Sequence, residues 1–168
     1  MDSEALRSLQ APLKGKYRGQ PATALVTLRA EGRLGDGVSC RIETGRALVE
    51  AGLHPATGGS GVQACSGDML LQALVACSGV TLSAVATSLG IALRDARLQA
   101  EGDLDFRGTL GVAKEVPVGF TQVRLRISLD TDATPEQVQK LIQLTERYCV
   151  VYQTLKTPPV MTVALEGN

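Results

Sequence analysis

Thiols are the side chains in this sequence best suited to chemistry. The chain contains four cysteines, Cys40, Cys65, Cys77 and Cys149, and a single histidine, His54. A cysteine thiolate is a nucleophile, and it can be oxidised reversibly to a sulfenic acid or a disulfide. The N-terminus has early acidic residues and no apolar signal segment, so we expect a cytoplasmic chain with reduced cysteines. The sequence therefore favours structural, catalytic or metal-binding cysteines over a permanent disulfide framework.

Two kinds of site that would use the histidine fit the sequence poorly. A serine hydrolase would need His54, which lies in a glycine-rich loop and has no Gly-x-Ser-x-Gly partner. A zinc site would draw on Cys65, Cys77, Cys149 and His54, but no pair has the spacing of about two to four residues that structural zinc sites use. Such a site would need ligands that converge from distant parts of the chain. The sequence therefore favours neither kind of site.

Cys77 and Cys149 occupy different predicted surroundings. Cys77 lies in the middle of a long apolar helix predicted for residues 67–90, with Ser66 as its N-cap and Gly90 as its C-terminal cap. Cys149 lies at the start of a short helix predicted for 150–155, where free backbone N–H groups favour a thiolate. By residue type alone, a buried structural role is the better explanation of both cysteines.

The remaining elements must position these two cysteines. The sequence predicts a helix at 3–17, strands at 22–30, 38–43 and 46–52 with a turn at 32–37, strands at 92–106 and 119–130, a helix that begins at Thr134-Pro135, and a last strand at 160–165. This order predicts an α+β fold with a mostly antiparallel sheet. We expect a single domain over residues 1–168, in which residues 1–20 form a helical extension.

Charge and hydropathy exclude several classes of partner. Seventeen basic residues balance seventeen acidic ones and no basic run stands out, which argues against a nucleic-acid partner. Polar residues interrupt the apolar stretch at 69–93, which indicates a buried helix and no membrane span. One face of this helix carries small residues that would let another helix approach closely. Its members are Leu70, Ala73, Leu74, Cys77, Val80, Thr81 and Ala84.

Two motifs resemble those of the OsmC family, which includes the organic hydroperoxide resistance (Ohr) proteins. Residues 65–77, CSGDMLLQALVAC, are similar to a family signature in which a carboxylate precedes an apolar run that ends at a cysteine in a long central helix. Residues 149–155 and the strand at 160–165 are similar to a second motif, in which Cys-Pro-Val is followed by a short helix and a closing strand. The order of elements matches from about residue 22 to the end.

The resemblance implies a fold, an assembly and an activity. The fold would be an intertwined homodimer in which strongly curved sheets wrap a pair of long central helices, with active sites at the dimer interface. The activity would be that of a thiol peroxidase that reduces organic hydroperoxides. A dithiol such as lipoamide would regenerate it, without metal or flavin. Cys77 would be the peroxidatic thiol and Cys149 the resolving thiol.

The resemblance also implies a supporting carboxylate and arginine. Asp68 stands at or near the position of a family glutamate that orients an arginine, and that arginine lowers the pKa of the peroxidatic thiol. Arg33 is the arginine whose context in the predicted turn fits best. The alternatives are Arg18, Arg29 and Arg41.

This sequence departs from the family pattern at three points. Asp68 is one methylene shorter than glutamate, Cys149 lacks the following proline, and Cys65 is an additional thiol. Asp68 and Cys77 are nine residues apart, which places them about half a turn out of phase on a regular helix. Asp68 could instead simply complement the dipole of the helix. Two alternative functions therefore remain: a non-enzymatic protein that binds a small apolar ligand at the dimer interface, and a stress protein with a zinc or redox switch.

Overall fold

A computed structural model describes residues 49–111 and 113–167 in full. It also describes residues 2–5, 8 and 11, and the backbone of 31–34, 39–43 and 48. Residues 3–5, 8 and 11 are helical, in agreement with part of the predicted N-terminal helix. The rest of that helix and the predicted strand at 22–30 lie outside the described residues.

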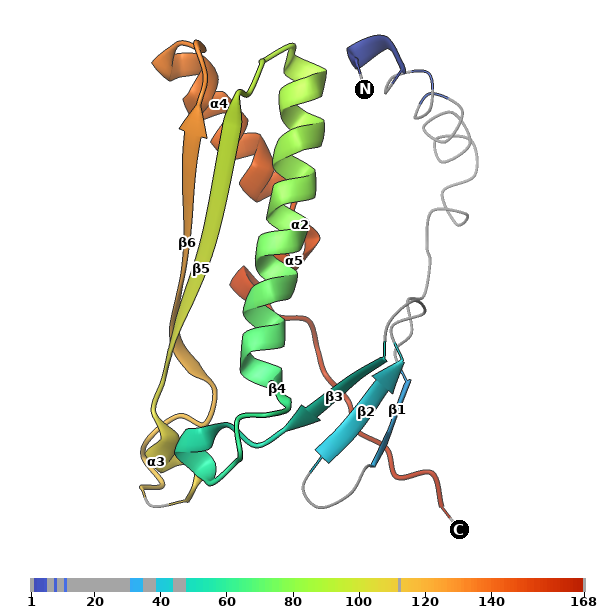
Figure 1. The fold of residues 1–168 in the computed structure, drawn as a ribbon, viewed down its shortest axis with the longest axis vertical. Helices are drawn as coiled ribbons and strands as arrows, with labels where there is room; N and C mark the ends of the chain where they lie inside the picture. The colour runs from blue at the N-terminus through green and yellow to red at the C-terminus, as the bar shows by residue number, and fades with distance from the viewer. Residues whose placement is uncertain are drawn as a thin grey trace.

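The long helix α2, Ser66–Leu89, stands at the centre of the molecule (Figure 1). It ends as predicted at Gly90, which adopts a left-handed φ of 69° and donates its N–H to the carbonyls of Ala86 and Thr87. Its N-cap, however, is Cys65 and not the predicted Ser66, which is already helical. Cys65 occupies the position where a serine or threonine hydroxyl would cap the helix, but its thiol makes no capping hydrogen bond.

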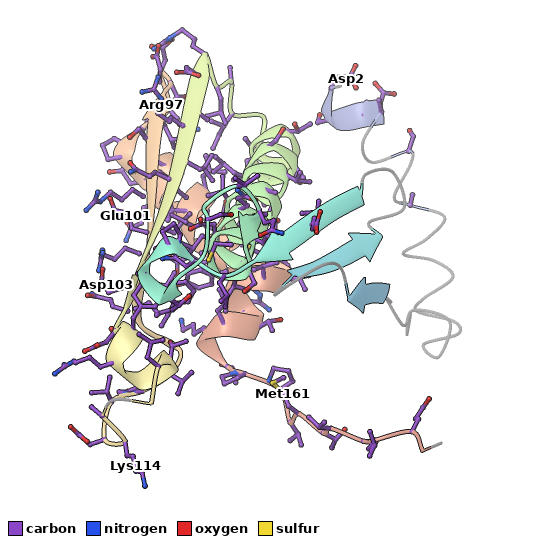
Figure 2. All side chains as sticks on the ribbon, turned by 60° about the horizontal axis from the view of Figure 1, so that its bottom comes forward. Asp2, Arg97, Glu101, Asp103, Lys114 and Met161 are labelled. Atoms are coloured by element: carbon purple, nitrogen blue, oxygen red, sulfur yellow. The ribbon has the colours of Figure 1, made fainter. Side chains whose placement is uncertain are left out.

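A two-stranded antiparallel sheet runs alongside α2 (Figure 1). Its strands are β5, Asp95–Leu104, and β6, Phe120–Asp130, which confirms both predicted strands. The short helix α3, Phe106–Thr109, lies in the connection between them. On the outer face of the sheet, Glu101 pairs with Arg126 at 2.8 Å and with Arg124 at 3.3 Å. Figure 2 shows Glu101 pointing away from the helices, so the inner face is left to apolar side chains.

Helices α4, Pro135–Tyr148, and α5, Val150–Lys156, complete the layer around α2. The predicted start of α4 is confirmed: Thr134 Oγ1 accepts from the N–H of Gln137 at 3.3 Å, and the Thr134 N–H donates to Gln137 Oε1 at 2.8 Å. Cys149 lies between the two helices, as the C-cap of α4 and the N-cap of α5. The predicted short helix after Cys149 is therefore also confirmed.

The core is formed by one line of α2 together with α4 and β5. The buried residues of α2 are Leu74, Ser78, Leu82 and Ala86, each one turn from the next. Leu82 and Ala86 pack in a cluster with Ile91 and Leu141. The predicted small-residue face of α2 is divided between core and surface: Leu74 is buried, whereas Leu70 is 39% exposed and Val80 is 74% exposed. Helix α5 of the same chain covers the part of that face around Cys77.

A second sheet contains β1, Glu31–Leu34, β2, Ser39–Glu43, β3, Leu48–Gly52, and β4, Ala64–Cys65, in that order. The predicted strands at 38–43 and 46–52 are confirmed. The predicted turn at 32–37 is wrong at its first three residues, because Gly32–Leu34 continue β1 and pair with β2. Both sheets are small and mostly antiparallel, with one parallel pair, β3 and β4. The α+β class is confirmed, but strong sheet curvature is not seen.

The predicted last strand at 160–165 does not form in the single chain. This segment has no regular secondary structure, and Figure 2 shows the chain at Met161 leaving the body of the molecule. Val160, Val163 and Leu165 are each at least 96% exposed. A strand requires a free edge with which to pair, and this segment pairs with none of the described strands.

Helix α2 is long and apolar enough to cross a membrane by length and composition, with a mean hydropathy of 1.8 over its most apolar window. Core helices of soluble proteins share these properties. Because α2 packs along one side against α4, α5 and β5, its contacts are those of a core helix.

Candidate functional site

The packing of α2 against α5 brings Cys77 and Cys149 together, although they are far apart in the sequence. Cys77 lies in the middle of α2 and is partly buried. Cys149 lies at the junction of α4 and α5, and its side chain is near enough to Cys77 to influence the ionisation of that thiol. Both are free thiols. The two cysteines singled out in the sequence therefore share one site.

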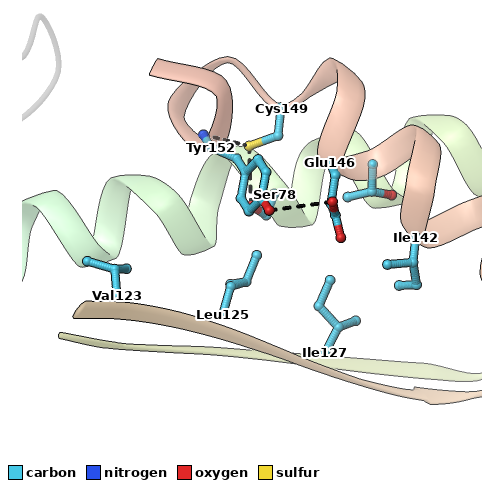
Figure 3. A pocket seen from close by; sticks show the side chains of 9 residues that line it. Ser78, Val123, Leu125, Ile127, Ile142, Glu146, Cys149 and Tyr152 are labelled. Atoms are coloured by element: carbon cyan, nitrogen blue, oxygen red, sulfur yellow. Dashed lines mark hydrogen bonds between the residues drawn. The ribbon is translucent and has the colours of Figure 1, made fainter. Parts of the chain in front are cut away.

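Cys149 is held in place by two polar contacts. It is 0% exposed, and its Sγ lies 3.2 Å from the Oγ of Ser78, which is equally buried (Figure 3). The backbone N–H of Tyr152, in the first turn of α5, donates to the same sulfur at 3.5 Å. Sequence reasoning missed Ser78. Its position one turn after Leu74 on the buried line of α2 is the signal that could have indicated it.

The surroundings of Cys77 favour its thiolate. Burial alone raises the pKa of Cys77, but several hydrogen bonds outweigh it and leave the pKa below its usual value. In decreasing order of effect, the groups that lower the pKa are the backbone of Val151, the Cys149 side chain, the backbone of Val150 and the side chain of Thr81. The Thr81 hydroxyl donates its hydrogen bond to the Cys77 carbonyl at 2.8 Å. The first two residues of α5 therefore contribute to the lowered pKa of Cys77. The sequence had predicted this effect for Cys149, which receives only the N–H of Tyr152.

Asp68 lies apart from the two cysteines in the single chain. It is exposed in the first turn of α2 and borders a cavity of about 550 Å³ that Cys65 and His54 also line, whereas Cys77 does not. Among the ion pairs of the described residues, none involves Asp68. The observed position fits the helical phase, which sets Asp68 and Cys77 on opposite sides of a regular helix.

The arginines proposed to support Cys77 fall mostly outside the described part of the chain. Arg33 and Arg41 are directly opposite each other in β1 and β2, where the structure describes their backbones only. Arg18 and Arg29 lie outside the described residues. Within the described residues, no arginine is among the groups that lower the pKa of Cys77.

His54 and Cys65 form no metal centre in the described part of the chain. The Nδ1 of His54 accepts a hydrogen bond from the N–H of Ala56 at 3.0 Å, and its ring stacks on Phe106 with a centroid separation of 4.9 Å. His54 therefore caps the short 3-10 helix η2, Pro55–Thr57. Among the described residues, no three His, Cys, Asp or Glu side chains gather closely enough to hold a metal ion.

A second cavity, of about 330 Å³, borders Cys149 on the side of the two-stranded sheet (Figure 3). Aliphatic side chains of β6 and α4 line one part of the cavity, and polar side chains line the rest. The aliphatic residues are Val123, Leu125 and Ile127 of β6 and Ile142 of α4. The polar lining residues are Ser78, Thr145, Glu146 and Tyr152. Glu146 is the only charged residue among them, and its Oε2 accepts a hydrogen bond from the Tyr152 hydroxyl at 3.4 Å.

This arrangement can carry out reversible thiol oxidation. A thiol with a lowered pKa reacts with electrophilic oxygen as its thiolate, and a second thiol beside it can condense with the product. Reversible oxidation of this pair of thiols is therefore a chemistry that the site can support.

Comparison with known proteins places this geometry in context. The family model of OsmC-like proteins matches residues 58–164, a span that contains both cysteines. The fold is similar to an OsmC-like protein from Mycoplasma pneumoniae, with a TM-score of 0.66 and 15% identity over 79% of this chain and 89% of that one. None of the curated protein sequences compared with the chain matches it.

Two further similar structures are organic hydroperoxide resistance proteins. The one from Legionella pneumophila has a TM-score of 0.61 and 19% identity, over 79% of this chain and 91% of that one. The one from Elizabethkingia anophelis has a TM-score of 0.62 and 19% identity, over 80% of this chain and 91% of that one. At these identities the similarity shows a shared fold.

Proposed function

The chain belongs to the OsmC-like family, and we propose that it is a thiol peroxidase that reduces organic hydroperoxides and is recycled by a dithiol. The observation that carries this proposal is the pairing of two free thiols, one of which has a lowered pKa. Similarity to two organic hydroperoxide resistance proteins supports the choice of substrate. We place this activity in oxidative-stress defence in the cytoplasm.

In the proposed reaction, Cys77 is the peroxidatic thiol. Its thiolate attacks the terminal oxygen of the hydroperoxide, the O–O bond breaks, and the alkoxide leaves and takes up a proton as the alcohol. Cys77 is then a sulfenic acid. The Cys149 sulfur attacks the Cys77 sulfur and forms the disulfide, while the hydroxyl group leaves with the Cys149 proton as water. A dithiol of the lipoamide type returns both cysteines to thiols.

Steady-state turnover of cumene hydroperoxide with dihydrolipoamide tests this proposal. We expect turnover by the wild type and none by Cys77→Ser. Cys149→Ser should turn over more slowly than the wild type, because the dithiol must then reduce the Cys77 sulfenic acid directly. Cys65→Ser is the matched control and should turn over normally, because Cys65 lies at the far cavity. A wild type that consumes no hydroperoxide would refute the proposal.

We also propose that Asp68 and Arg33 support Cys77 in the assembled protein. The test compares Arg33→Ala with Arg41→Ala, since these positions face each other in β1 and β2. If Arg33 supports the thiolate, its loss slows sulfenic acid formation at neutral pH, and the loss of Arg41 does not. Equal rates for both variants would remove Arg33 from the mechanism.

We propose that the protein functions as a homodimer. Two apolar surfaces of the single chain support this: the α2 face that includes Leu70 and Val80, and the exposed segment 160–165. Light scattering of the full chain should give the mass of two chains, and a chain ended after Pro159 should give one. A monomeric full chain would contradict the proposal.

A second candidate function is the binding of a small apolar ligand without catalysis. The observation that favours it is the pair of cavities of about 330 and 550 Å³, both largely lined by apolar residues. Under this function Cys77→Ser would leave the affinity for an alkyl ligand unchanged, and the wild type would show no turnover in the assay above.

A further inference from the structure

Ser78 is a buried residue whose hydroxyl is directed at a sulfur. It is 0% exposed on the core line of α2, and its Oγ lies 3.2 Å from the Sγ of Cys149 (Figure 3). A hydroxyl inside a helix often donates to the carbonyl four residues earlier, and Thr81 and Thr87 do so on this same helix. Within the described residues Ser78 makes no such bond, and Cys149 is its partner instead.

The other hydroxyls beside Cys149 are engaged elsewhere. Thr145 and Tyr152 line the same cavity as Ser78. The Thr145 hydroxyl donates to a carbonyl of its own helix at 2.8 Å, and the Tyr152 hydroxyl donates to Glu146 at 3.4 Å. Among the hydroxyls that line this cavity, Ser78 is therefore the one that contacts the sulfur.

We propose that Ser78 is a positioning residue for the resolving step, in which it donates a hydrogen bond to the Cys149 sulfur as that sulfur attacks Cys77. The inference rests on the proposed function, which supplies the Cys77 sulfenic acid. The Cys149 sulfur forms a bond to the Cys77 sulfur, and the S–O bond breaks with its electron pair on oxygen. The hydroxyl group leaves with the Cys149 proton as water. Ser78 keeps its own proton and acts through Cys149.

The direction of this hydrogen bond follows from the change at Cys149. While Cys149 is a thiol, either atom of the contact can be the donor. Once the sulfur has lost its proton it can only accept, so Ser78 must then be the donor. The backbone N–H of Tyr152 donates to the same sulfur at 3.5 Å. Two donors therefore face the sulfur as negative charge develops on it.

Burial makes these donors important for the rate. Because Cys149 is 0% exposed, bulk water does not surround the charge that develops on its sulfur. A buried charge that lacks hydrogen bonds is costly, and one hydrogen bond to a charged group changes an equilibrium by roughly ten-fold or more. Loss of the Ser78 hydroxyl should therefore slow the attack by Cys149. It leaves Cys77, which is partly exposed, accessible to reagents from solvent.

Closure of a mixed disulfide tests the role of Ser78 without a hydroperoxide. All proteins in this test carry Cys40→Ser and Cys65→Ser, so that Cys77 and Cys149 are the thiols that remain. One equivalent of 2,2′-dipyridyl disulfide reacts first with the partly exposed Cys77 and releases one pyridine-2-thione. Cys149 then attacks the Cys77 sulfur, releases the second pyridine-2-thione and closes the disulfide. Stopped-flow absorbance of the released thione gives the rates of both steps.

The two steps distinguish a positioning role from a structural one. We expect Ser78→Ala to slow the second step by roughly ten-fold or more and to change the first step by less than roughly two-fold. Ser78→Thr and Ser78→Val have nearly the same shape and differ in the hydroxyl, so Ser78→Thr should close faster than Ser78→Val by a similar factor. This pair keeps the test decisive if Ser78→Ala is unstable. Equal closure by Ser78→Thr and Ser78→Val, or equal slowing of both steps in Ser78→Ala, would overturn the proposal.

Turnover of cumene hydroperoxide by the wild type separates this inference from the peroxidase proposal. If the mixed disulfide closes but no hydroperoxide is consumed, the peroxidase proposal fails. The comparison of Ser78→Thr with Ser78→Val then still supports or overturns the role of Ser78 in disulfide closure. If Cys149 never displaces the second pyridine-2-thione when Ser78 is present, both proposals are refuted.

Discussion

Replacement of Val150 by proline separates the structural and chemical roles of the start of α5. Val150 is the first residue of α5, and its side chain is 70% exposed, so little packing is lost. Proline is accepted at the first position of a helix. The preceding residue, Cys149, has an extended backbone with φ of −72° and ψ of 108°, close to the conformation that proline requires before it. The fold should therefore tolerate Val150→Pro.

The chemical effect of this substitution follows from the lost N–H group. The Val150 N–H is one of the groups that lower the pKa of Cys77, and proline has no N–H. A hydrogen bond to a charged acceptor contributes about 1.5 kcal/mol at the lower end of its range, a factor of about ten in an equilibrium. The Cys77 thiolate population at neutral pH should therefore fall by up to about ten-fold. Fold stability should change little or increase by about 0.4–1 kcal/mol through the reduced entropy of the unfolded chain.

The assay measures the pH dependence of Cys77 alkylation by iodoacetamide, with mass spectrometry to identify the site. Because the thiolate is the form that reacts with iodoacetamide, alkylation rises with pH through the pKa of Cys77. Val150→Pro removes a group that lowers this pKa and should shift the rise to higher pH. Val150→Ala keeps the N–H and should match the wild type. An unchanged profile for Val150→Pro, with the fold intact, would refute the assignment of the α5 N–H groups to Cys77.

Four further predictions concern stability. Ser78→Ala removes the buried hydroxyl that contacts Cys149 and should cost about 1–2 kcal/mol in urea unfolding; a cost near zero would show that this contact does not stabilise the fold. Leu82→Ala should cost about 2–5 kcal/mol, because Leu82 is 1% exposed in the core, and Ser83→Ala on the exposed side of α2 is its control. Thr134→Ala breaks the capping box and should cost about 1 kcal/mol; an equally stable variant would contradict this. The lowered pKa of Cys77 gives stability that is fully present above the pKa of the unfolded thiol and is lost as pH falls through the folded pKa. The stability of the wild type relative to Cys77→Ser should therefore rise from neutral to alkaline pH, and a fall would contradict the direction of the shift.

The sequence was most informative where local signals determine structure. The Thr134-Pro135 start of α4, the Gly90 end of α2 and the alternation of β6 each depend on residues close together in the chain. The two motifs at Cys77 and Cys149 indicated the family. These signals placed the elements that hold the two thiols, and the structure confirms those elements.

The sequence was less informative where structure depends on distant parts of the chain. Apolar residues occur all around α2, so periodicity did not identify its buried line, which contains Ser78. The effect of Val150 and Val151 on the pKa of Cys77 depends on how α5 packs on α2. The strand-like pattern at 160–165 describes a segment that can pair, but pairing needs an edge that the described strands of this chain do not supply.

The most direct test of the central claim is a single oxidation of the reduced protein with one equivalent of cumene hydroperoxide. Tryptic mapping without reduction should show one new disulfide that joins the peptide 148–156 to the peptide 47–94, which contains both Cys65 and Cys77. Fragment ions of this linked pair should place the disulfide at Cys77 and leave Cys65 a free thiol. A disulfide between any other pair, or four thiols that remain unmodified, would contradict the assignment of Cys77 and Cys149 as the reacting pair.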